Sequence, residues 1–250
     1  MYSFWRKLLD VPFFLLVLIE ALLFFVGDVL MWVCTVWWDK RRVWLHRYSI
    51  MWAHIVLGVN PGWRTVVEGR ELIDPNKTYV IVANHQSLAD ILVLYALRSH
   101  FKWVSKKELA RVPIIGWNLY LNRYMLIDRR SFGGSKRMLV EGLKNLGMGN
   151  SLLVFPEGTR SATGRMGRFK DGAFNVAQQG QVDLLPVVVD GTRNVFKDGY
   201  LHYKQTFRIK VLPAIPYSAY AERTPAEVAQ QMHQLMEAEL RSMAPDLYEA

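Results

Sequence analysis

Short apolar segments and helix-like segments alternate regularly after residue 62, and this alternation leaves few folds open to the chain. The apolar segments are rich in β-branched and aromatic residues, which strands favour. We therefore predict one α/β domain with a mixed, largely parallel sheet flanked by helices. The predicted strands are residues 65–69, 78–84, 101–105, 124–128, 151–155, 184–190 and 207–212. The predicted helices are residues 88–97, 108–121 with a break near Pro113, 135–146, 171–179 and 224–243.

The first 60 residues differ, because two long apolar stretches follow one another there. Residues 11–38 are long enough to cross a bilayer. Basic residues flank both ends, so the charge rule gives no orientation, and no small-residue cleavage site marks a signal peptide. The second stretch, residues 43–59, interleaves Trp and Tyr, as at a membrane interface. We predict that residues 1–60 form an anchor of two hydrophobic membrane helices; the alternative is that both helices simply pack on the domain of residues 61–250.

Two acids in the first stretch bear on how the anchor meets the membrane. A carboxylate at mid-bilayer costs about 3 kcal/mol on insertion scales. We favour helices half-sunk in one leaflet, with Glu20 and Asp28 facing the headgroups or the α/β domain. The alternative is one spanning helix with Glu20 neutral or paired. Cys34, the single cysteine, excludes an intrachain disulfide, and we expect it to be a buried small hydrophobe.

The charge balance favours a negatively charged partner. The chain has 31 Lys and Arg against 22 Asp and Glu, a net charge of +9, which suits anionic lipid, phosphate or coenzyme. No RNA-recognition, homeodomain or zinc-finger pattern is present, so we expect no nucleic acid partner. The six His residues show no ligand spacing, and we expect no metal.

A first candidate site is Asn-His-Gln-Ser-Leu-Ala-Asp at residues 84–90, between a predicted buried strand and a predicted apolar helix. His85 then lies at the strand end, and Asp90 lies about one turn into the helix. An Asp that accepts from one ring nitrogen leaves the other as a general base, as in a Ser-His-Asp triad with a substrate hydroxyl in place of the Ser. An isolated pair with this spacing also fits an ordinary helix start, and the strand–loop–helix context favours the catalytic interpretation.

A second candidate is Phe-Pro-Glu-Gly-Thr-Arg at residues 155–160, at the end of another predicted strand. Pro156 and Gly158 favour a tight loop from which Glu157 and Arg160 project. The planar guanidinium of Arg160 suits a phosphate group. Taken alone, this segment is equally compatible with an ordinary strand-exit turn.

Together, about 70 residues apart and in this order, the two segments resemble the glycerolipid acyltransferase family, also called the lysophosphatidate acyltransferase family. Residues 121–130 (LNRYMLIDRR) resemble a further block of the family, an apolar strand that ends in Ile-Asp-Arg. Residues 184–192 (LLPVVVDGT) resemble its last block, and residues 104–117 its segment between the first two blocks. The resemblance covers roughly residues 65–195, and a membrane-active N-terminus is typical of the family.

The resemblance implies a role for each matching residue. His85 takes the proton from the acceptor hydroxyl, and Asp90 orients His85 and stabilises its charge. Arg129 contributes to acceptor binding, and Lys106 is a weaker candidate for a phosphate contact. Pro186 shapes the last strand. The site for the acceptor phosphate is formed by Glu157, Gly158, Thr159 and Arg160.

The implied activity is transfer of a fatty acyl group to the sn-2 hydroxyl of 1-acyl-glycerol-3-phosphate, which forms phosphatidic acid in phospholipid biosynthesis. The donor is acyl-CoA or acyl carrier protein, and because its thioester is already activated we expect no cofactor and no covalent enzyme intermediate. We expect location on the cytoplasmic face of the inner or plasma membrane, or its equivalent. The alternatives are an acyltransferase for another lysophospholipid or an aminolipid, and a non-catalytic lipid-binding membrane protein of the same fold. A Ser hydrolase is disfavoured because no Gly-x-Ser-x-Gly elbow is present.

Overall fold

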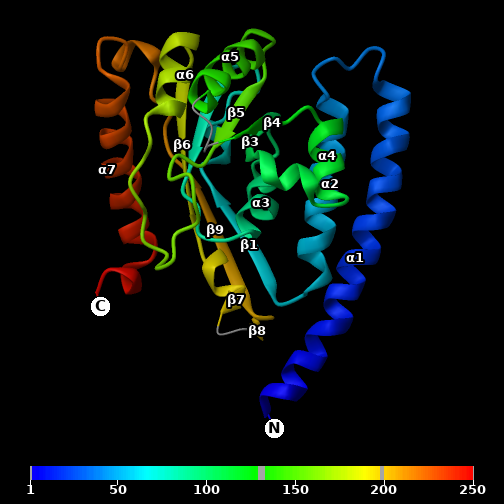
Figure 1. Cartoon of the computed structure of the whole chain (residues 1–250). Helices are drawn as coiled ribbons and strands as arrows, with labels where there is room; N and C mark the ends of the chain where they lie inside the picture. The colour runs from blue at the N-terminus through cyan, green and yellow to red at the C-terminus, as the bar shows by residue number, and fades with distance from the viewer. Residues whose placement is uncertain (1, 129–132, 198–199, 250) are drawn as a thin grey trace.

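A computed structural model of the chain describes residues 2–128, 133–197 and 200–249. Its centre is a sheet that has seven strands within these residues, in the order β1-β9-β6-β2-β5-β3-β4 (Figure 1). The strands are β1 (Trp63–Glu68), β2 (Tyr79–Ala83), β3 (Phe101–Lys106), β4 (Met125–Ile127), β5 (Ser151–Val154), β6 (Asp183–Asp190) and β9 (Gln205–Val211). A short hairpin of β7 (Phe196–Lys197) and β8 (Tyr200–Leu201) follows β6.

The strand directions place the ends of the three central strands at one edge. Neighbours from β6 through β2, β5, β3 and β4 run parallel, whereas β9 pairs with β6 in the antiparallel sense and β1 is parallel to β9. The predicted fold class, a mixed and largely parallel sheet flanked by helices, is confirmed. The carboxyl ends of β2, β5 and β6 therefore lie side by side, where open α/β sheets bind ligands.

Helices cover both faces of the sheet (Figure 1). One face packs against α5 (Gly134–Gly147), α6 (Gly172–Gly180) and α7 (Pro225–Met243), and the other against α2 (Val43–Val59) and α3 (Ala89–Leu94). Side chains of β2 alternate between the two cores and are all buried, which is why the strand reads as one continuous apolar run.

Two predicted helices are shorter in the structure. The predicted helix of residues 88–97 is α3 followed by a 3₁₀ turn, η2 (Tyr95–Leu97), and that of residues 108–121 divides around Pro113 into η3 (Lys107–Arg111) and α4 (Ile115–Leu121). A proline lacks the N–H that a helix interior needs, and the expected break near Pro113 is confirmed. The other 3₁₀ turns are η1 (Arg70–Leu72), η4 (Thr192–Asn194), η5 (Tyr217–Ala219) and η6 (Pro245–Leu247).

The N-terminal segment forms a helical hairpin on the side of the domain. Helix α1 (Tyr2–Thr35) runs antiparallel to α2, which buries one face against α3 and η2 (Figure 1). Within the described residues, Asp10–Thr35 is the one helical segment that is long and apolar enough to cross a membrane. The expectation that Cys34 is buried is wrong: it is exposed, because α1 packs on the domain with its opposite face.

Two of the three acids of α1, Asp10 and Asp28, contact the domain, whereas most of the exposed side chains of α1 are apolar. Asp10 accepts a hydrogen bond of 2.8 Å from the hydroxyl of Tyr203. Asp28 is fully buried and accepts a hydrogen bond from the side-chain amide of Asn118, in α4. These contacts lie 18 residues apart on α1, about 27 Å along a helix. Helix α1, which has 34 residues, is therefore held against the domain over about half of its length.

Candidate active site

Loops that follow three neighbouring strands meet at the carboxyl edge of the sheet. Strand β2 lies between β5 and β6 and runs parallel to both. The side chain of Asn84 extends the ladder beyond β2: its amide donates to the carbonyl of Val189 at 2.9 Å, and its oxygen accepts from the N–H of Val189 at 2.8 Å. The start of the turn that carries His85 is thereby joined to the end of β6.

His85 and Asp90 form a hydrogen-bonded pair across this turn. The imidazole Nδ1 lies 2.7 Å from Asp90 Oδ2. An ionised carboxylate only accepts, so Nδ1 carries the proton and Nε2 keeps a lone pair. Within the described part of the chain Nε2 has no hydrogen-bond partner, and 14% of the His85 side chain is exposed. The pair has the geometry of an oriented general base.

The Asp90 carboxylate is fully buried and accepts from three further donors. The backbone N–H groups of Gln86 and Ser87 lie 2.7 Å and 2.8 Å from Oδ2, and the hydroxyl of Thr192 donates to Oδ1. A buried anion is costly unless donors replace its lost water. These donors therefore stabilise the charge of Asp90 and hold it in one orientation against His85.

The imidazole is also held by an aromatic ring. Phe155, directly after β5, stacks on His85 with the ring centres 4.0 Å apart and the planes 10° from parallel. Trp103 in turn packs against Phe155 with a ring-centre distance of 5.8 Å. This stacking restricts rotation of the imidazole and shields one of its faces from water.

Glu157 joins the two sequence motifs through backbone contacts. Its Oε1 accepts from the N–H of His85 at 2.8 Å, and its Oε2 accepts from the N–H of Gly167 at 2.9 Å. Burial raises the pKa of Glu157, and the two backbone donors act in the opposite direction. The side chain points inward instead of projecting from the loop as the sequence suggested, because its carboxylate bridges two loops. Its part in an acceptor phosphate site stays a prediction.

The other predicted binding residues lie on exposed loops around this edge. Gly158 has a φ of 76°, a left-handed conformation that glycine adopts without strain, and it turns the chain outward. Thr159 and Arg160 are exposed, and the structure gives Arg160 no hydrogen-bond or ion-pair partner among the described residues. Lys106 is exposed at the end of β3. Arg129 lies outside the described residues.

Ser161, which follows Arg160, joins this loop to the turn that carries His85. The N–H of Ser161 donates to the carbonyl of His85 at 2.8 Å, and the Glu157 contact lies on the N–H of the same His85. Both main-chain polar groups of His85 are therefore bonded to the loop after β5. Arg160 stands one residue from this contact, so the exposed guanidinium and the oriented base belong to one structural unit.

A small cavity adjoins the same loop. It has a volume of about 190 Å³ and lies between the ends of β3, β4 and β5 and the amino ends of α5 and α6. Its walls are mainly apolar and include Val104, Ile127, Met138 and Phe155. Because Phe155 also stacks on His85, an apolar ligand in this cavity would be one side chain away from the imidazole.

The sequence of residues 64–190 matches the family model described as acyltransferase. That span is about half of the chain and contains both motifs that meet at the sheet edge. The chain belongs to the acyltransferase family. The matched span includes His85 and the exposed Arg160, which lie on adjacent loops at the sheet edge.

Several curated acyltransferases are similar in sequence. The chain is 34% identical over 200 residues to a 1-acyl-sn-glycerol-3-phosphate acyltransferase of Chlamydomonas reinhardtii, covering 80% of the chain and 57% of the relative. It is 36% identical over 160 residues to a chloroplastic one of Arabidopsis thaliana, covering 64% and 44%. For one of Pseudomonas aeruginosa the identity is 30% over 209 residues, covering 83% and 77%. The chain spans about half the length of the first two relatives.

A solved acyltransferase structure has the same fold. The crystal structure of the 1-acyl-sn-glycerophosphate (LPA) acyltransferase PlsC from Thermotoga maritima aligns with a TM-score of 0.75 at 23% identity, over 95% of this chain and 97% of that one. This coverage is wider than the span of residues 64–190 that the family model matches, so the shared fold extends beyond that span.

Two residues of this acyltransferase-family site were not predicted from the sequence. Thr192 contacts Asp90 from the turn after β6, and Gln86 lies within hydrogen-bond distance of that same turn. The available signal was the position of Thr192 directly after an apolar strand, since parallel strands bring such turns to one edge. The neighbouring Gly191 has a φ of 91° and permits the sharp turn.

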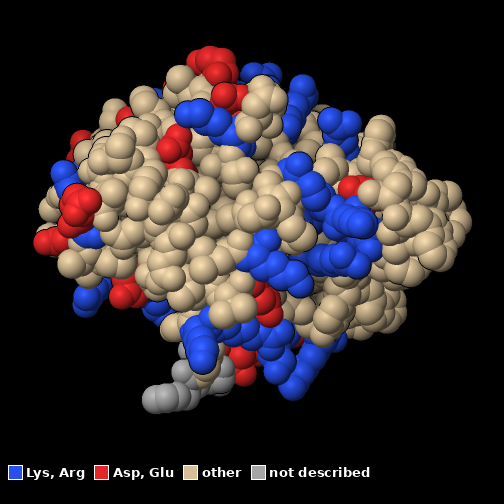
Figure 2. Space-filling view, turned by 90° about the horizontal axis from the view of Figure 1, so that it is seen from above, with Lys and Arg blue, Asp and Glu red and all other residues tan. Residues whose placement is uncertain are grey.

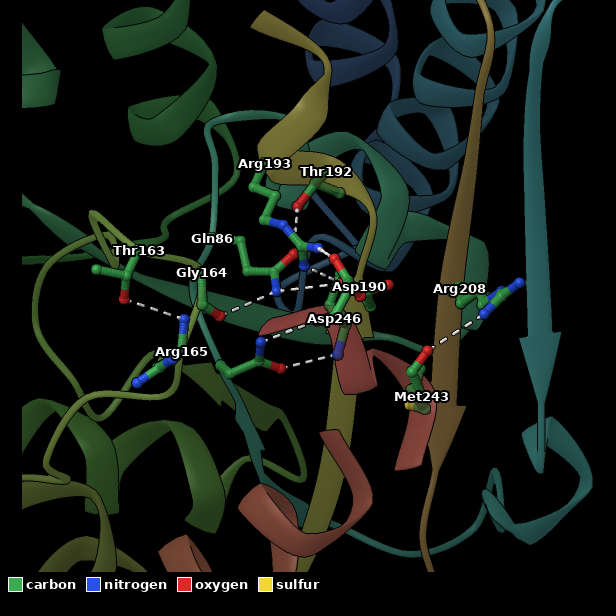
Figure 3. A network of polar contacts seen from close by, with 12 residues as sticks. Gln86, Thr163, Gly164, Arg165, Asp190, Thr192, Arg193, Arg208, Met243 and Asp246 are labelled. Carbon is green, nitrogen blue, oxygen red and sulfur yellow. Dashed lines mark hydrogen bonds and ion pairs between the residues drawn. The ribbon is translucent and has the colours of Figure 1, made fainter. Parts of the chain in front are cut away.

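A polar network supports the turn that carries Thr192 (Figure 3). Arg193 pairs with Asp190 at 2.6 Å and with Asp246, in η6, at 2.8 Å. Gln86 donates to the carbonyl of Gly164 at 3.2 Å. The network connects the catalytic turn, the loop of residues 161–168 and the C-terminal segment, which are distant in the sequence. The position of Thr192 thus depends on contacts from all three.

Proposed function

We propose that the protein transfers a fatty acyl group to the sn-2 hydroxyl of 1-acyl-glycerol-3-phosphate and so forms phosphatidic acid in phospholipid biosynthesis. The observation that carries the proposal is the oriented His85, with Nε2 unpartnered among the described residues, on one unit with exposed Arg160. The names of the relatives, 1-acyl-sn-glycerol-3-phosphate acyltransferases, support the same acceptor.

The chemistry needs a base and two positioned reactants. His85 Nε2 accepts the proton of the acceptor hydroxyl as its oxygen attacks the carbonyl carbon of the donor thioester. A carbon–oxygen bond forms, and collapse of the tetrahedral intermediate breaks the carbon–sulfur bond. The proton on His85 then passes to the departing thiolate. Asp90 stabilises the imidazolium that exists between these two transfers.

The acceptor and the acyl donor would contact different parts of the site. The acceptor's phosphate is a dianionic group that suits the planar guanidinium of Arg160. The apolar cavity beside Phe155 suits part of an acyl chain. Both candidate donors, acyl-CoA and acyl carrier protein, are anionic and suit a chain of net charge +9.

We also propose that α1 lies in one leaflet, on the cytoplasmic side. The contacts of Asp10 and Asp28 with the domain support this arrangement, because a helix that leaves the domain to cross the bilayer would break them. Single cysteines at Ser3 and Lys40, with Cys34 replaced, can be tested with an impermeant thiol reagent on sealed vesicles. Both sites should label from the face that carries the catalytic domain. Labelling from opposite faces would instead support a spanning helix.

The activity is tested by a turnover assay on membranes that contain the purified protein. The acceptors are 1-acyl-glycerol-3-phosphate, other lysophospholipids and a single-chain aminolipid, each with acyl-CoA and with acyl carrier protein. We expect phosphatidic acid as the main product. Preference for another acceptor would reassign the substrate, and no turnover with any pair would support a non-catalytic lipid-binding protein.

A further inference from the structure

Basic side chains gather at the opposite end of the sheet from the active site. We name Arg41, Arg42, His100, Lys102 and Arg123 the hairpin-tip cluster, since they surround the tip of the α1–α2 hairpin and the amino end of β3. The active site lies at the carboxyl edge, about one strand length away. Figure 2 looks onto the hairpin end and shows a band of Lys and Arg beside an uncharged lobe at the right, where α1 lies.

Two cations of the cluster are buried. The Lys102 residue is 1% exposed, and its ammonium donates to the carbonyl of Asn122 at 2.8 Å. Arg42 is 2% exposed, and its Nε has no hydrogen-bond partner in the part of the chain that the structure describes. Burial, with the nearby charges of Arg42, Arg123 and Arg41, lowers the pKa of Lys102 to about 7.

The chain supplies little negative charge to balance these cations. Asp39 is the nearby acid, but its two oxygens accept from the backbone N–H groups of Val43 and Trp44 at 2.9 Å and 2.8 Å, where they cap α2. Among the described residues, no carboxylate lies within 4.0 Å of a charged nitrogen of the cluster. Buried cations without a counter-charge are costly, so the cluster is incomplete without an anion.

The surroundings of the cluster are those of a membrane interface. Trp37, Trp38 and Trp44 are 82%, 59% and 45% exposed at the same hairpin tip. Exposed Trp is enriched where a protein meets lipid headgroups. Helix α1, which leads to the tip, carries a continuous outward row of exposed apolar side chains. A soluble anion would leave these aromatic and apolar side chains exposed to water, whereas the acyl chains of a lipid would cover them.

We propose that the hairpin-tip cluster binds the headgroup phosphate of an anionic phospholipid in the leaflet that holds α1. The lipid phosphate supplies a negative counter-charge for the four basic residues Arg41, Arg42, Lys102 and Arg123. The acyl chains of the lipid lie beside the tryptophans and α1. This site is separate from the acceptor site. It fixes the depth and direction of the hairpin in an anionic membrane.

The test is direct binding of a short-chain lipid to the full chain in neutral detergent. Dihexanoyl-phosphatidylglycerol is titrated by calorimetry, with dihexanoyl-phosphatidylcholine and inorganic phosphate as comparisons. We expect one saturable site for phosphatidylglycerol and binding of the other two that is about ten-fold weaker or more. Equal affinity for inorganic phosphate would overturn the lipid assignment, and absence of saturable phosphatidylglycerol binding would overturn the site.

Variants locate the binding. Replacing the exposed pair Arg41→Gln and Arg123→Gln should weaken phosphatidylglycerol binding about ten-fold or more, since each basic residue contributes about five-fold near a membrane surface. The matched control is Arg223→Gln with Arg241→Gln, exposed on the α7 side and equal in charge, and it should change binding less than about two-fold. If both double variants lost affinity for phosphatidylglycerol equally, the binding would reflect only general charge attraction, and the site would be refuted.

Two further variants distinguish loss of lipid binding from unfolding of the protein and from binding of the lipid in the acceptor site. Lys102→Met keeps an unbranched side chain in the buried position and should weaken phosphatidylglycerol binding while circular dichroism remains unchanged. Arg160→Gln should leave this binding intact. Loss of binding in Arg160→Gln would place the lipid in the acceptor site and refute the proposal, whatever becomes of the catalytic function.

Discussion

Replacing Thr192 by Val removes one donor from the Asp90 carboxylate and leaves the shape of the side chain nearly unchanged. Thr192 is fully buried, and its hydroxyl donates to Asp90 Oδ1. A hydrogen bond to a charged group contributes about 1.5–3 kcal/mol when its loss leaves the partner buried and unpaired. Three donors remain on Oδ2, so we expect the lower part of this range. A loss of about 1.5 kcal/mol in the transition state corresponds to about a ten-fold lower kcat.

The assay is steady-state acyl transfer across a range of pH values. Thr192→Val should lower kcat about ten-fold with little change in KM, and it should shift the pH profile of kcat, because Asp90 loses a donor that fixes its orientation and tunes its basicity toward the imidazole. Thr192→Ser, which restores a hydroxyl, should recover most of the rate. Thr65→Val is the control, since Thr65 lies in β1 away from the site. A Thr192→Val protein with normal kcat and an unchanged pH profile would refute the positioning role.

Three further predictions concern other residues. His85→Ala should lower turnover by about 100- to 10,000-fold while the circular dichroism spectrum stays native; near-normal turnover would exclude a general base at this position. Arg160→Ala should raise KM more for a phosphate-bearing acceptor than for one without phosphate, with partial recovery in Arg160→Lys; equal increases for both acceptors would show that Arg160 does not read the phosphate. The pKa of Lys102, lowered to about 7, implies that the unfolded chain binds more protons above this pH, so the free energy of unfolding should rise by about 1 kcal/mol per pH unit from pH 7 toward the ordinary lysine value. Lys102→Met should lack this rise in denaturant titrations, and identical slopes in both proteins would contradict the buried charge.

Local features of the site follow from the sequence because their residues are close in the chain. His85 and Asp90 are five positions apart across one strand-to-helix turn, and the reversal of the chain at that turn brings the two side chains together. The alternation of apolar segments was enough to predict the fold class, since period and composition reflect local burial. The length of the apolar stretch in α1 was likewise evident. Which way its acids point was not, because that depends on the contacts of Asp10 and Asp28 with distant segments.

Only the tertiary structure decided which loops meet at the catalytic edge. The strand order places β2 between β5 and β6, and this order brings Glu157 to the backbone of His85 and Thr192 to Asp90 across sequence separations of 72 and 102 residues. The same holds for the hairpin-tip cluster, whose members come from three separate segments of the sequence, residues 41–42, 100–102 and 123. Strand neighbours are selected by how whole faces pack, a property of the assembled sheet. For that reason a local pattern could indicate the candidate general base, His85, but not the groups that hold it in place.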